Sequence, residues 1–193
     1  QTLFAGGVTP DPDRIRTVYR TAKRALAEKL GPLHVDASDA GGRALRLAAL
    51  SLQSELDGGA AALALFDTAQ TMTEEAGALA CLIGTASGDD AVARFEAKWR
   101  HDRIVMDKWF TLQVLHADDA PAVADALTRH PLFDWKNPNR FRAVFGALSA
   151  NHAGFHRADG SGYRLLADWL IRLDPVNPQT AARMSQAFDS VAR

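Results

Sequence analysis

A chain of 193 residues is long enough to bury a core of ordinary size, and it fits one domain or one extended helical array. It carries 22 Lys and Arg residues against 23 Asp and Glu residues, and 47% of its residues are hydrophobic, which argues against disorder. The formal net charge of -1 excludes a general phosphate-binding surface, because nucleic-acid binders normally present a basic stripe. We therefore expect no nucleic-acid partner.

The one cysteine, Cys81, lies in an apolar run and has no partner for an intramolecular disulfide. We interpret it as a small buried residue of a protein in a reducing compartment. No apolar stretch reaches the roughly 20 residues that a membrane-spanning helix needs, and the first residues lack the basic start and apolar core of a secretion signal. We therefore expect a cytoplasmic location and no membrane partner.

The first predicted helix runs from Asp11 to Leu30, with Asp11 as its N-cap and Pro12 as its first residue. Apolar residues recur at steps of three and four and form a continuous stripe on one face: Ile15, Val18, Tyr19, Ala22, Leu26 and Leu30. A second amphipathic helix follows the loop Gly31–Asp39 and ends at Gly58 and Gly59. Its residues expected to face inward are Leu45, Ala48, Ala49, Leu52 and Leu56.

The same pattern continues to the end of the chain, with no alternating strand pattern between the helices. One predicted helix begins after Thr71 or Thr73, where Glu74 is available for a capping box. The other predicted helices are Ala60–Ala69, Ser87–His101, Ile104–His116, Ala120–Arg129, Pro138–Ala150, Gly162–Leu173 and Pro178–Val191. Roughly ten helices result, so the fold class is all-α.

Short loops make consecutive helices antiparallel neighbours. The simplest packing is therefore a superhelical α-solenoid of antiparallel helix pairs, similar to ARM and HEAT repeats. The chain shows no fixed sequence period, and a compact irregular bundle is the alternative architecture.

The motif search finds no catalytic signature. The sequence has no H-E-x-x-H, no G-x-S-x-G and no phosphate-binding loop. His152 and His156 have a four-residue spacing, but Gly154 lies between them and Asn151–Gly162 is predicted as a loop, so we interpret both as loop residues and not as metal ligands. The four tryptophans are expected to pack between helices.

Two helix starts are unusual because they combine an Asn N-cap, a proline and arginines. They are Asn137-Pro138-Asn139-Arg140-Phe141-Arg142 and Asn177-Pro178-Gln179-Thr180-Ala181-Ala182-Arg183. A cation near a helix N-terminus runs against the helix dipole, so each guanidinium group is expected to meet either a carboxylate of the chain or an anionic ligand. The residues alone leave both alternatives open.

Several long segments resemble the C-terminal helical domain of bacterial aminopeptidase N, also called alanyl aminopeptidase, of the zinc-dependent gluzincin family. They are TMTEEAGALACL (residues 71–82), VMDKWFTLQ (residues 105–113) and the stretch from His130 to Arg183. The resemblance covers residues 9–193 in order, whereas residues 1–8 match nothing in it. It implies that the family continues through a few more helices after Arg193.

The resemblance implies a part of a metalloprotease rather than an enzyme complete in itself. Zinc and the hydrolytic residues would belong to a catalytic domain of the same parent chain, which removes N-terminal residues from peptides; this chain would hold no cofactor. The helical domain would enclose the active-site cavity. Arg142, Gln179 and Arg183 match family positions that face this cavity, so the resemblance implies that they contact the C-terminal side of a peptide substrate. The alternative function is a free-standing helical-repeat scaffold for a protein partner.

Overall fold

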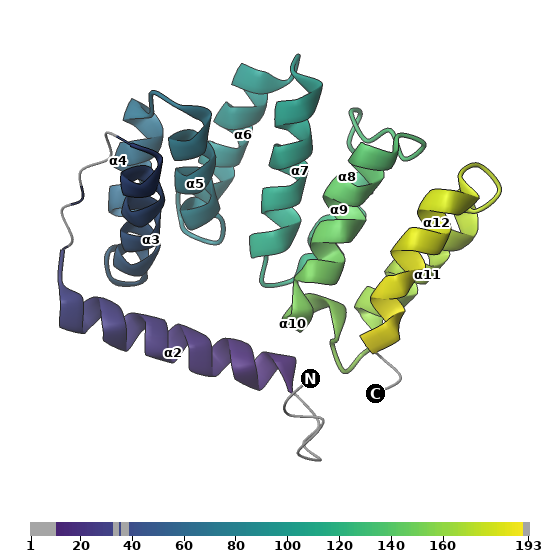
Figure 1. Ribbon diagram of the computed structural model, residues 1–193, viewed down its shortest axis with the longest axis horizontal. Helices are drawn as coiled ribbons and strands as arrows, with labels where there is room; N and C mark the ends of the chain where they lie inside the picture. The colour runs from purple at the N-terminus through teal and green to yellow at the C-terminus, as the bar shows by residue number, and fades with distance from the viewer. Residues whose placement is uncertain (1–10, 33–34, 36–38, 191–193) are drawn as a thin grey trace. The chain divides into compact units, whose positions relative to one another are not determined.

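The computed structural model describes residues 11–32, 35 and 39–190. Over these residues it contains eleven α-helices, one short 3-10 helix and no β-strand (Figure 1). The elements are α2 (Pro12–Leu30), α3 (Ala40–Asp57), α4 (Ala60–Thr68), α5 (Met72–Leu82), α6 (Gly88–Trp99), α7 (Arg103–His116), α8 (Ala120–Thr128), α9 (Pro138–Ala150), α10 (His152–Phe155), α11 (Ser161–Leu173), α12 (Pro178–Ser185) and η1 (Gln186–Ser190). The prediction of an all-α chain is confirmed, while segment 1–8 lies outside the described residues.

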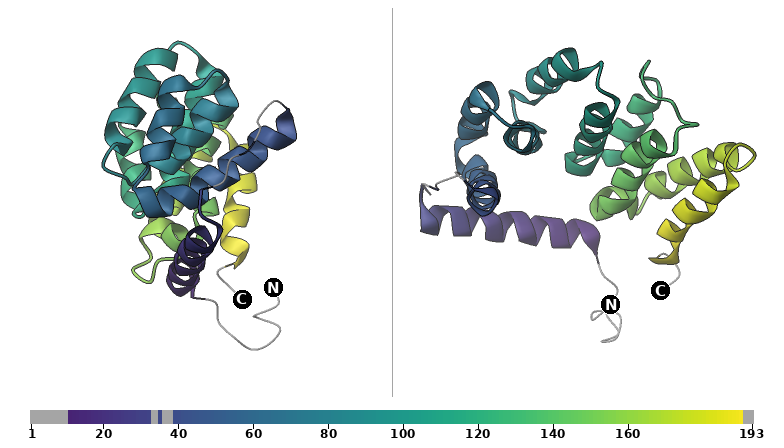
Figure 2. Two further views of the ribbon diagram at one scale, coloured as in Figure 1. Left: turned by 90° about the vertical axis from the view of Figure 1, so that its left-hand side faces the viewer. Right: turned by 45° about the horizontal axis from the view of Figure 1, so that its top comes forward.

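The chain divides into two compact units. One comprises the described parts of Gln1–Arg16 and Gln113–Arg193, and the other is Thr17–Leu112. In the second unit, α3, α4 and α5 pack against one another and α5 also packs against α6 (Figure 1, Figure 2). In the first unit, α8, α9, α10 and α11 are mutual neighbours, and α12 packs against α9 and α11. Helices close in sequence are thus also close in space, which is the pattern of stacked helical repeats.

Helix ends follow the local sequence signals. The Asp11 carboxylate accepts a hydrogen bond from the Arg14 N–H at 3.0 Å and so caps α2. α3 is followed by Gly58, whose φ of 64° is left-handed and costs glycine little. The Thr71 hydroxyl accepts the Glu74 N–H at 3.2 Å, which places the predicted capping box at Thr71 and not at Thr73. These three signals are local, and all three correctly predict the ends of helices.

The buried side of α3 differs from the predicted one. Three residues predicted to face inward are exposed: Leu45, Ala48 and Leu56. Ala49 and Leu50 are buried, and half-buried Leu47 packs against Gly77 of α5. A Cβ atom on Gly77 would lie 2.6 Å from the Leu47 methyl carbons, so a larger residue there would require the Leu47 side chain to shift. The leucines of α3 lie on two sides of the helix, Leu45, Leu52 and Leu56 on one and Leu47 and Leu50 on the other, and the second side is the more buried.

The C-terminal helix and the loop after α9 also differ from prediction. The predicted helix Pro178–Val191 ends as an α-helix at Ser185 and continues as the 3-10 helix η1, while Val191 lies outside the described residues. Phe188 of η1 packs against Phe155, with ring centroids 5.8 Å apart, and the tighter turn of a 3-10 helix accommodates this contact. Phe155 belongs to α10, a short helix within the predicted loop Asn151–Gly162.

Aromatic side chains fill the core of each unit. In the first unit Trp169 lies 5.5 Å from Phe133 and 5.5 Å from Phe145, measured between ring centroids. In the second unit Trp109 is buried and donates its indole N–H to the Val92 carbonyl at 2.9 Å. These tryptophans pack between helices, as expected. Cys81 is only partly buried, but burial is still the main cause that raises the pKa of its thiol.

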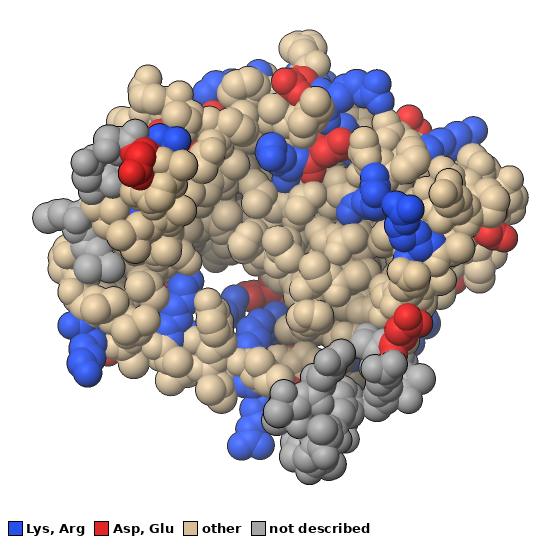
Figure 3. Space-filling model, in the orientation of Figure 1, with Lys and Arg blue, Asp and Glu red and all other residues tan. Residues whose placement is uncertain are grey.

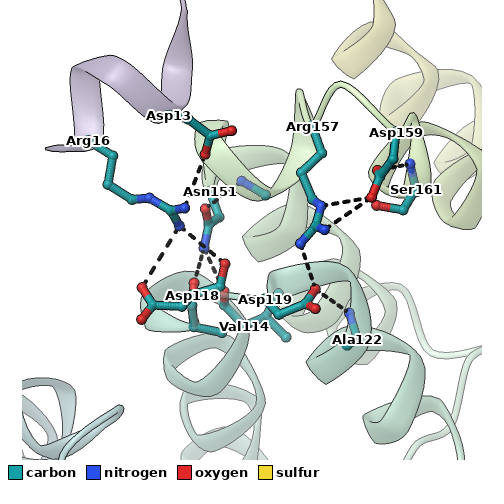
Figure 4. Close-up of polar contacts among 12 residues, drawn as sticks. Asp13, Arg16, Val114, Asp118, Asp119, Ala122, Asn151, Arg157, Asp159 and Ser161 are labelled. Atoms are coloured by element: carbon teal, nitrogen blue, oxygen red, sulfur yellow. Dashed lines mark hydrogen bonds and ion pairs between the residues drawn. The ribbon is translucent and has the colours of Figure 1, made fainter.

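The Asn151 side chain joins the end of α7 to the start of α10 (Figure 4). Its amide nitrogen donates to the carbonyls of Val114 at 3.1 Å and Ala117 at 2.9 Å, and its oxygen accepts the Gly154 N–H at 3.0 Å. One side chain therefore satisfies backbone groups at two helix ends. Nearby, the Arg157 guanidinium group lies 3.2 Å from the carboxylate of Asp119, the N-cap of α8.

We predict that Asn151→Ala destabilises the folded chain by about 2 to 3 kcal/mol, because it leaves helix-end carbonyls without a donor and removes the α10 cap. The measurement is chemical denaturation followed by circular dichroism. Thr68→Ala is the control, since it removes one exposed side-chain bond to a helix carbonyl and should change stability by no more than about 0.5 kcal/mol. Equal effects of the two substitutions would contradict the role given to Asn151.

Candidate functional site

The two Asn-Pro helix starts form as predicted. The Asn137 side-chain oxygen accepts the backbone N–H groups of Asn139 at 3.0 Å and Arg140 at 3.4 Å. The Asn177 side-chain oxygen accepts the Thr180 N–H at 3.0 Å. A proline follows each cap, where its missing N–H costs no helical hydrogen bond. Arg142 follows in the first turns of α9, as predicted. α12 ends as an α-helix at Ser185, so Arg183 lies in its last turn, where a cation agrees with the helix dipole and the predicted conflict does not arise.

The two arginines at the start of α9 have different roles. Arg140 is 6% exposed and donates to the Leu132 carbonyl at 2.8 Å, so it anchors the loop between α8 and α9. Arg142 is exposed, and its guanidinium group donates to the Asn139 side-chain oxygen at 2.6 Å and to the Pro138 carbonyl at 3.2 Å. Both acceptors of Arg142 are neutral. Within the described residues, no carboxylate of the chain neutralises its charge.

Gln179 and Arg183 lie on the exposed side of α12. The opposite side of this helix carries Ala181 and Met184, which are buried. Neither the Gln179 nor the Arg183 side chain makes a hydrogen bond or ion pair within the part of the chain that the structure describes. α12 packs against α9, so the helix that carries Arg142 and the helix that carries Gln179 and Arg183 are direct neighbours.

Gln179 and Arg183 form no side-chain hydrogen bond or ion pair among the described residues, and the hydrogen bonds of Arg142 stay within the start of its own helix. A guanidinium group offers paired N–H donors that match a carboxylate or a carbonyl, and a carboxamide offers both a donor and an acceptor. The Asn139 bond is a feature that the sequence analysis did not identify, and it fixes the orientation of the Arg142 guanidinium group. Its signal is the three-residue spacing on a helix, which places the two side chains side by side. Such groups bind and orient a ligand, and none of them is a nucleophile or a general base.

A second group of polar residues surrounds α10. The rings of His152 and His156 are nearly parallel at 7°, with centroids 5.8 Å apart, and the His156 Nδ1 lies 2.7 Å from the Tyr163 hydroxyl. The prediction that both histidines lie in a loop is wrong for His152, which begins α10, whereas His156 follows the helix as its C-cap. Burial, and then the neighbouring His152, lower the pKa of His156. The imidazole of His156 therefore favours its neutral form.

The described residues do not provide the ligands of a zinc site. Over the described ranges 11–32, 35 and 39–190, no group of three or more His, Cys, Asp and Glu side chains is arranged to hold a metal ion. Catalytic zinc sites use three protein ligands, and the sequence contains no H-E-x-x-H that would supply two of them. In the same ranges, no helix is long and apolar enough to span a bilayer.

Charged side chains do not form a continuous basic stripe on the face drawn in Figure 3. Lys and Arg groups are scattered over this face, and several lie beside Asp or Glu groups. Individual pairs include Arg94 with Asp67 at 2.6 Å and Lys23 with Glu55 at 2.8 Å. The surface on this side has the mixed charge that the composition indicates.

Packed neighbouring helices joined by short loops define a helical-repeat domain. The chain belongs to the family described as "Domain of unknown function (DUF3458_C) ARM repeats", whose model matches residues 7–193. This match confirms the expected ARM-like architecture and argues against the alternative, an irregular bundle.

Proteins of similar sequence and structure support this family assignment. The chain is 43% identical to aminopeptidase N of Haemophilus influenzae over 66% of its own length and 15% of that protein. It is 39% identical to aminopeptidase N of Caulobacter vibrioides over 80% of its own length and 19% of that protein. The crystal structure of Legionella pneumophila aminopeptidase A in complex with aspartic acid matches 93% of this chain and 24% of that chain, with a TM-score of 0.82 and 29% identity. The chain thus spans less than a quarter of the relatives it matches, and it corresponds to a C-terminal region of aminopeptidase N.

We predict that His152→Gln raises the pKa of His156, because it removes a neighbouring positive charge, and that burial still keeps this pKa below about 6.5. Histidine NMR titration of the folded chain measures it. The pKa of His156 is lower in the folded chain than in the unfolded chain. The stability that His156 contributes is therefore fully present above about pH 6.5, and it is lost as the pH falls through the folded-state pKa. An unchanged pKa in His152→Gln would contradict the coupling between the two rings.

Proposed function

We propose that this chain is the non-catalytic C-terminal domain of a zinc-dependent aminopeptidase that removes N-terminal residues from peptides. The observation that carries the proposal is the match to aminopeptidase N of several bacteria, together with the absence of a zinc-binding group among the described residues. In this proposal the zinc ion and the hydrolytic residues belong to a catalytic domain of the same parent chain. The proposed location is the cytoplasm.

We further propose that the domain encloses the active-site cavity and contacts the C-terminal side of a bound peptide through Arg142, Gln179 and Arg183. The support is that the charge of Arg142 meets only neutral oxygens in the described structure, while Arg183 meets no acid there. An arginine whose charge is not neutralised within its own chain is suited to an anionic ligand, and a peptide ends in a carboxylate. α9 and α12, the helices that carry the three side chains, pack against each other within the first unit.

In the parent enzyme, we predict that Arg142→Ala or Arg183→Ala raises KM for short peptides by about tenfold, since each removes a charge-assisted contact with the substrate carboxylate. KM for an aminoacyl anilide, which has no such carboxylate, should change by less than about twofold. Steady-state kinetics on both substrates provide the measurement.

Arg129→Ala is the matched control for this experiment. Arg129 is also exposed, but its guanidinium group pairs with the Asp125 carboxylate at 2.6 Å. Its removal should leave both KM values unchanged. Equal effects of Arg142→Ala on the peptide and on the anilide would reject the carboxylate role while leaving the domain assignment intact.

The isolated 193-residue chain should show no aminopeptidase activity with added zinc, because its described residues offer no group that would hold the ion. The measurement is release of product from an alanyl anilide at several zinc concentrations, with the parent enzyme as the positive control. Metal-dependent turnover above background by the isolated chain would overturn the proposed division between the two domains.

A further inference from the structure

Two tryptophans and two cations form a cluster where the loop between α8 and α9 meets α11. Trp135 and Lys136 come from this loop, while Trp169 and Arg172 lie three residues apart on α11. The centroids of the two indole rings are 6.3 Å apart, and the rings are inclined at 62°. We call these four residues the Trp-Arg cluster. All four belong to the first unit, so the cluster is formed within that unit alone.

The Arg172 guanidinium group lies over both indole rings of the cluster. Its Cζ atom is 5.0 Å from the ring centroid of Trp135 and 4.9 Å from that of Trp169. Asp168 precedes Arg172 by four residues on α11, a spacing that allows a helical ion pair, but the described structure shows no such pair. A ring contact orders the guanidinium group but, unlike a carboxylate, supplies no acceptor to its N–H groups. Arg172 is therefore held in place with its donors still available, and its side chain is exposed.

The side chains of the Trp-Arg cluster offer hydrogen-bond donors and no acceptor. The Lys136 ammonium group lies 5.6 Å from the ring centroid of Trp135. Within the described residues, neither cation forms a side-chain hydrogen bond or ion pair, and neither indole N–H of the cluster has an acceptor. The other two tryptophans differ, because Trp109 donates to a backbone carbonyl and Trp99 donates to the Glu75 carboxylate. The unpaired donors of the first unit's indoles thus coincide with two unpaired positive charges.

These features select the chemistry of a ligand. The paired N–H groups of a guanidinium match the two oxygens of a carboxylate, and the second cation favours a second negative charge. The two half-buried indole rings add apolar surface, and tryptophan and arginine are the residue types that most often dominate the binding energy of protein interfaces. Single-stranded nucleic acid also stacks on aromatic rings, but its continuous phosphates would meet Asp134 and Asp168, which directly precede the two tryptophans. A peptide with one or two acidic side chains avoids this repulsion.

We propose that the Trp-Arg cluster binds a short acidic segment of a partner protein. One carboxylate pairs with the guanidinium N–H groups of Arg172, a second lies near Lys136, and an apolar side chain between them packs on the indole rings. The cluster contains none of the residues proposed to contact the peptide substrate, so this inference does not rest on the proposed function.

The first test uses a peptide with blocked ends, acetyl-Gly-Leu-Glu-Leu-Glu-Gly-amide, and the full-length protein that contains this chain. The blocked ends prevent hydrolysis and remove the terminal carboxylate expected at Arg142. Isothermal titration calorimetry at low ionic strength should show binding, and replacement of both glutamates by glutamine should weaken it by about tenfold or more. Equal affinity for the two peptides, or no binding of the acidic one, would overturn the proposal.

The second test locates the binding on the protein. Arg172→Ala should weaken binding of the acidic peptide about tenfold, and Arg172→Lys about fivefold, because lysine keeps the charge but not the paired donors. Arg164→Ala is the matched control and should change affinity by less than about twofold. Arg164 is exposed on the same helix and forms neither an ion pair nor a ring contact within the described residues. Equal losses in Arg164→Ala and Arg172→Ala, or unchanged affinity in Arg172→Lys, would reject the assigned contact.

The third test examines the aromatic part and the nucleic-acid alternative. Trp135→Leu keeps an apolar side chain but removes the ring face and the indole N–H, so it should weaken peptide binding about fivefold, with an unchanged circular dichroism spectrum. Unchanged affinity would overturn the role of the indole. A single-stranded oligothymidylate that binds more tightly than the acidic peptide, and loses this binding in Arg172→Ala, would replace the acidic segment by nucleic acid as the ligand.

Discussion

Every helix leaves four N–H groups at its start and four carbonyls at its end without a helical partner, and a chain of short helices faces this constraint at each turn. Asn151 meets this constraint at two helices at once, because its side-chain amide donates to carbonyls at the end of α7 and accepts an N–H at the start of α10. The hydrogen bonds that satisfy these helix ends therefore also hold the two helices together. Asn137 and Asn177 each cap the start of a single helix, α9 and α12 respectively. The relative placement of consecutive helices in each unit thus depends on a few short polar side chains as much as on the apolar core.

The same constraint explains which parts of the fold were predictable from sequence. Capping residues and glycines act on their own neighbours, so Asp11, Thr71 and Gly58 mark helix ends correctly without knowledge of the tertiary structure. Inward faces are different, because periodicity reveals an apolar side but not what covers it. The leucines of α3 are an example, since they lie on two sides of the helix and packing against α4 and α5 leaves only Leu50 buried among them. α10 was not predicted, because a helix of four residues is too short to show a periodic pattern.

The candidate site was partly predictable for a related reason. Arginines near two predicted helix starts opposed the helix dipole, and that local anomaly singled them out. The structure keeps the anomaly at α9 but not at α12, because α12 ends at Ser185 and Arg183 therefore lies in its last turn. The sequence did not separate Arg140 from Arg142, because the difference between them is whether the guanidinium group reaches the Leu132 carbonyl or solvent. That difference depends on the course of the loop between α8 and α9, which no local pattern specifies. The role of the three residues toward a peptide derives from family resemblance and remains a proposal.

The neutral partners of Arg142 have a consequence for how the site responds to its surroundings. A guanidinium group held by a carboxylate loosens when salt screens the pair, but one held by an amide oxygen and a carbonyl keeps its orientation. Its attraction for an incoming anion is still screened. If Arg142 binds the substrate as proposed, raising the ionic strength weakens that binding without releasing the guanidinium group from its neutral partners, so affinity and local geometry vary independently.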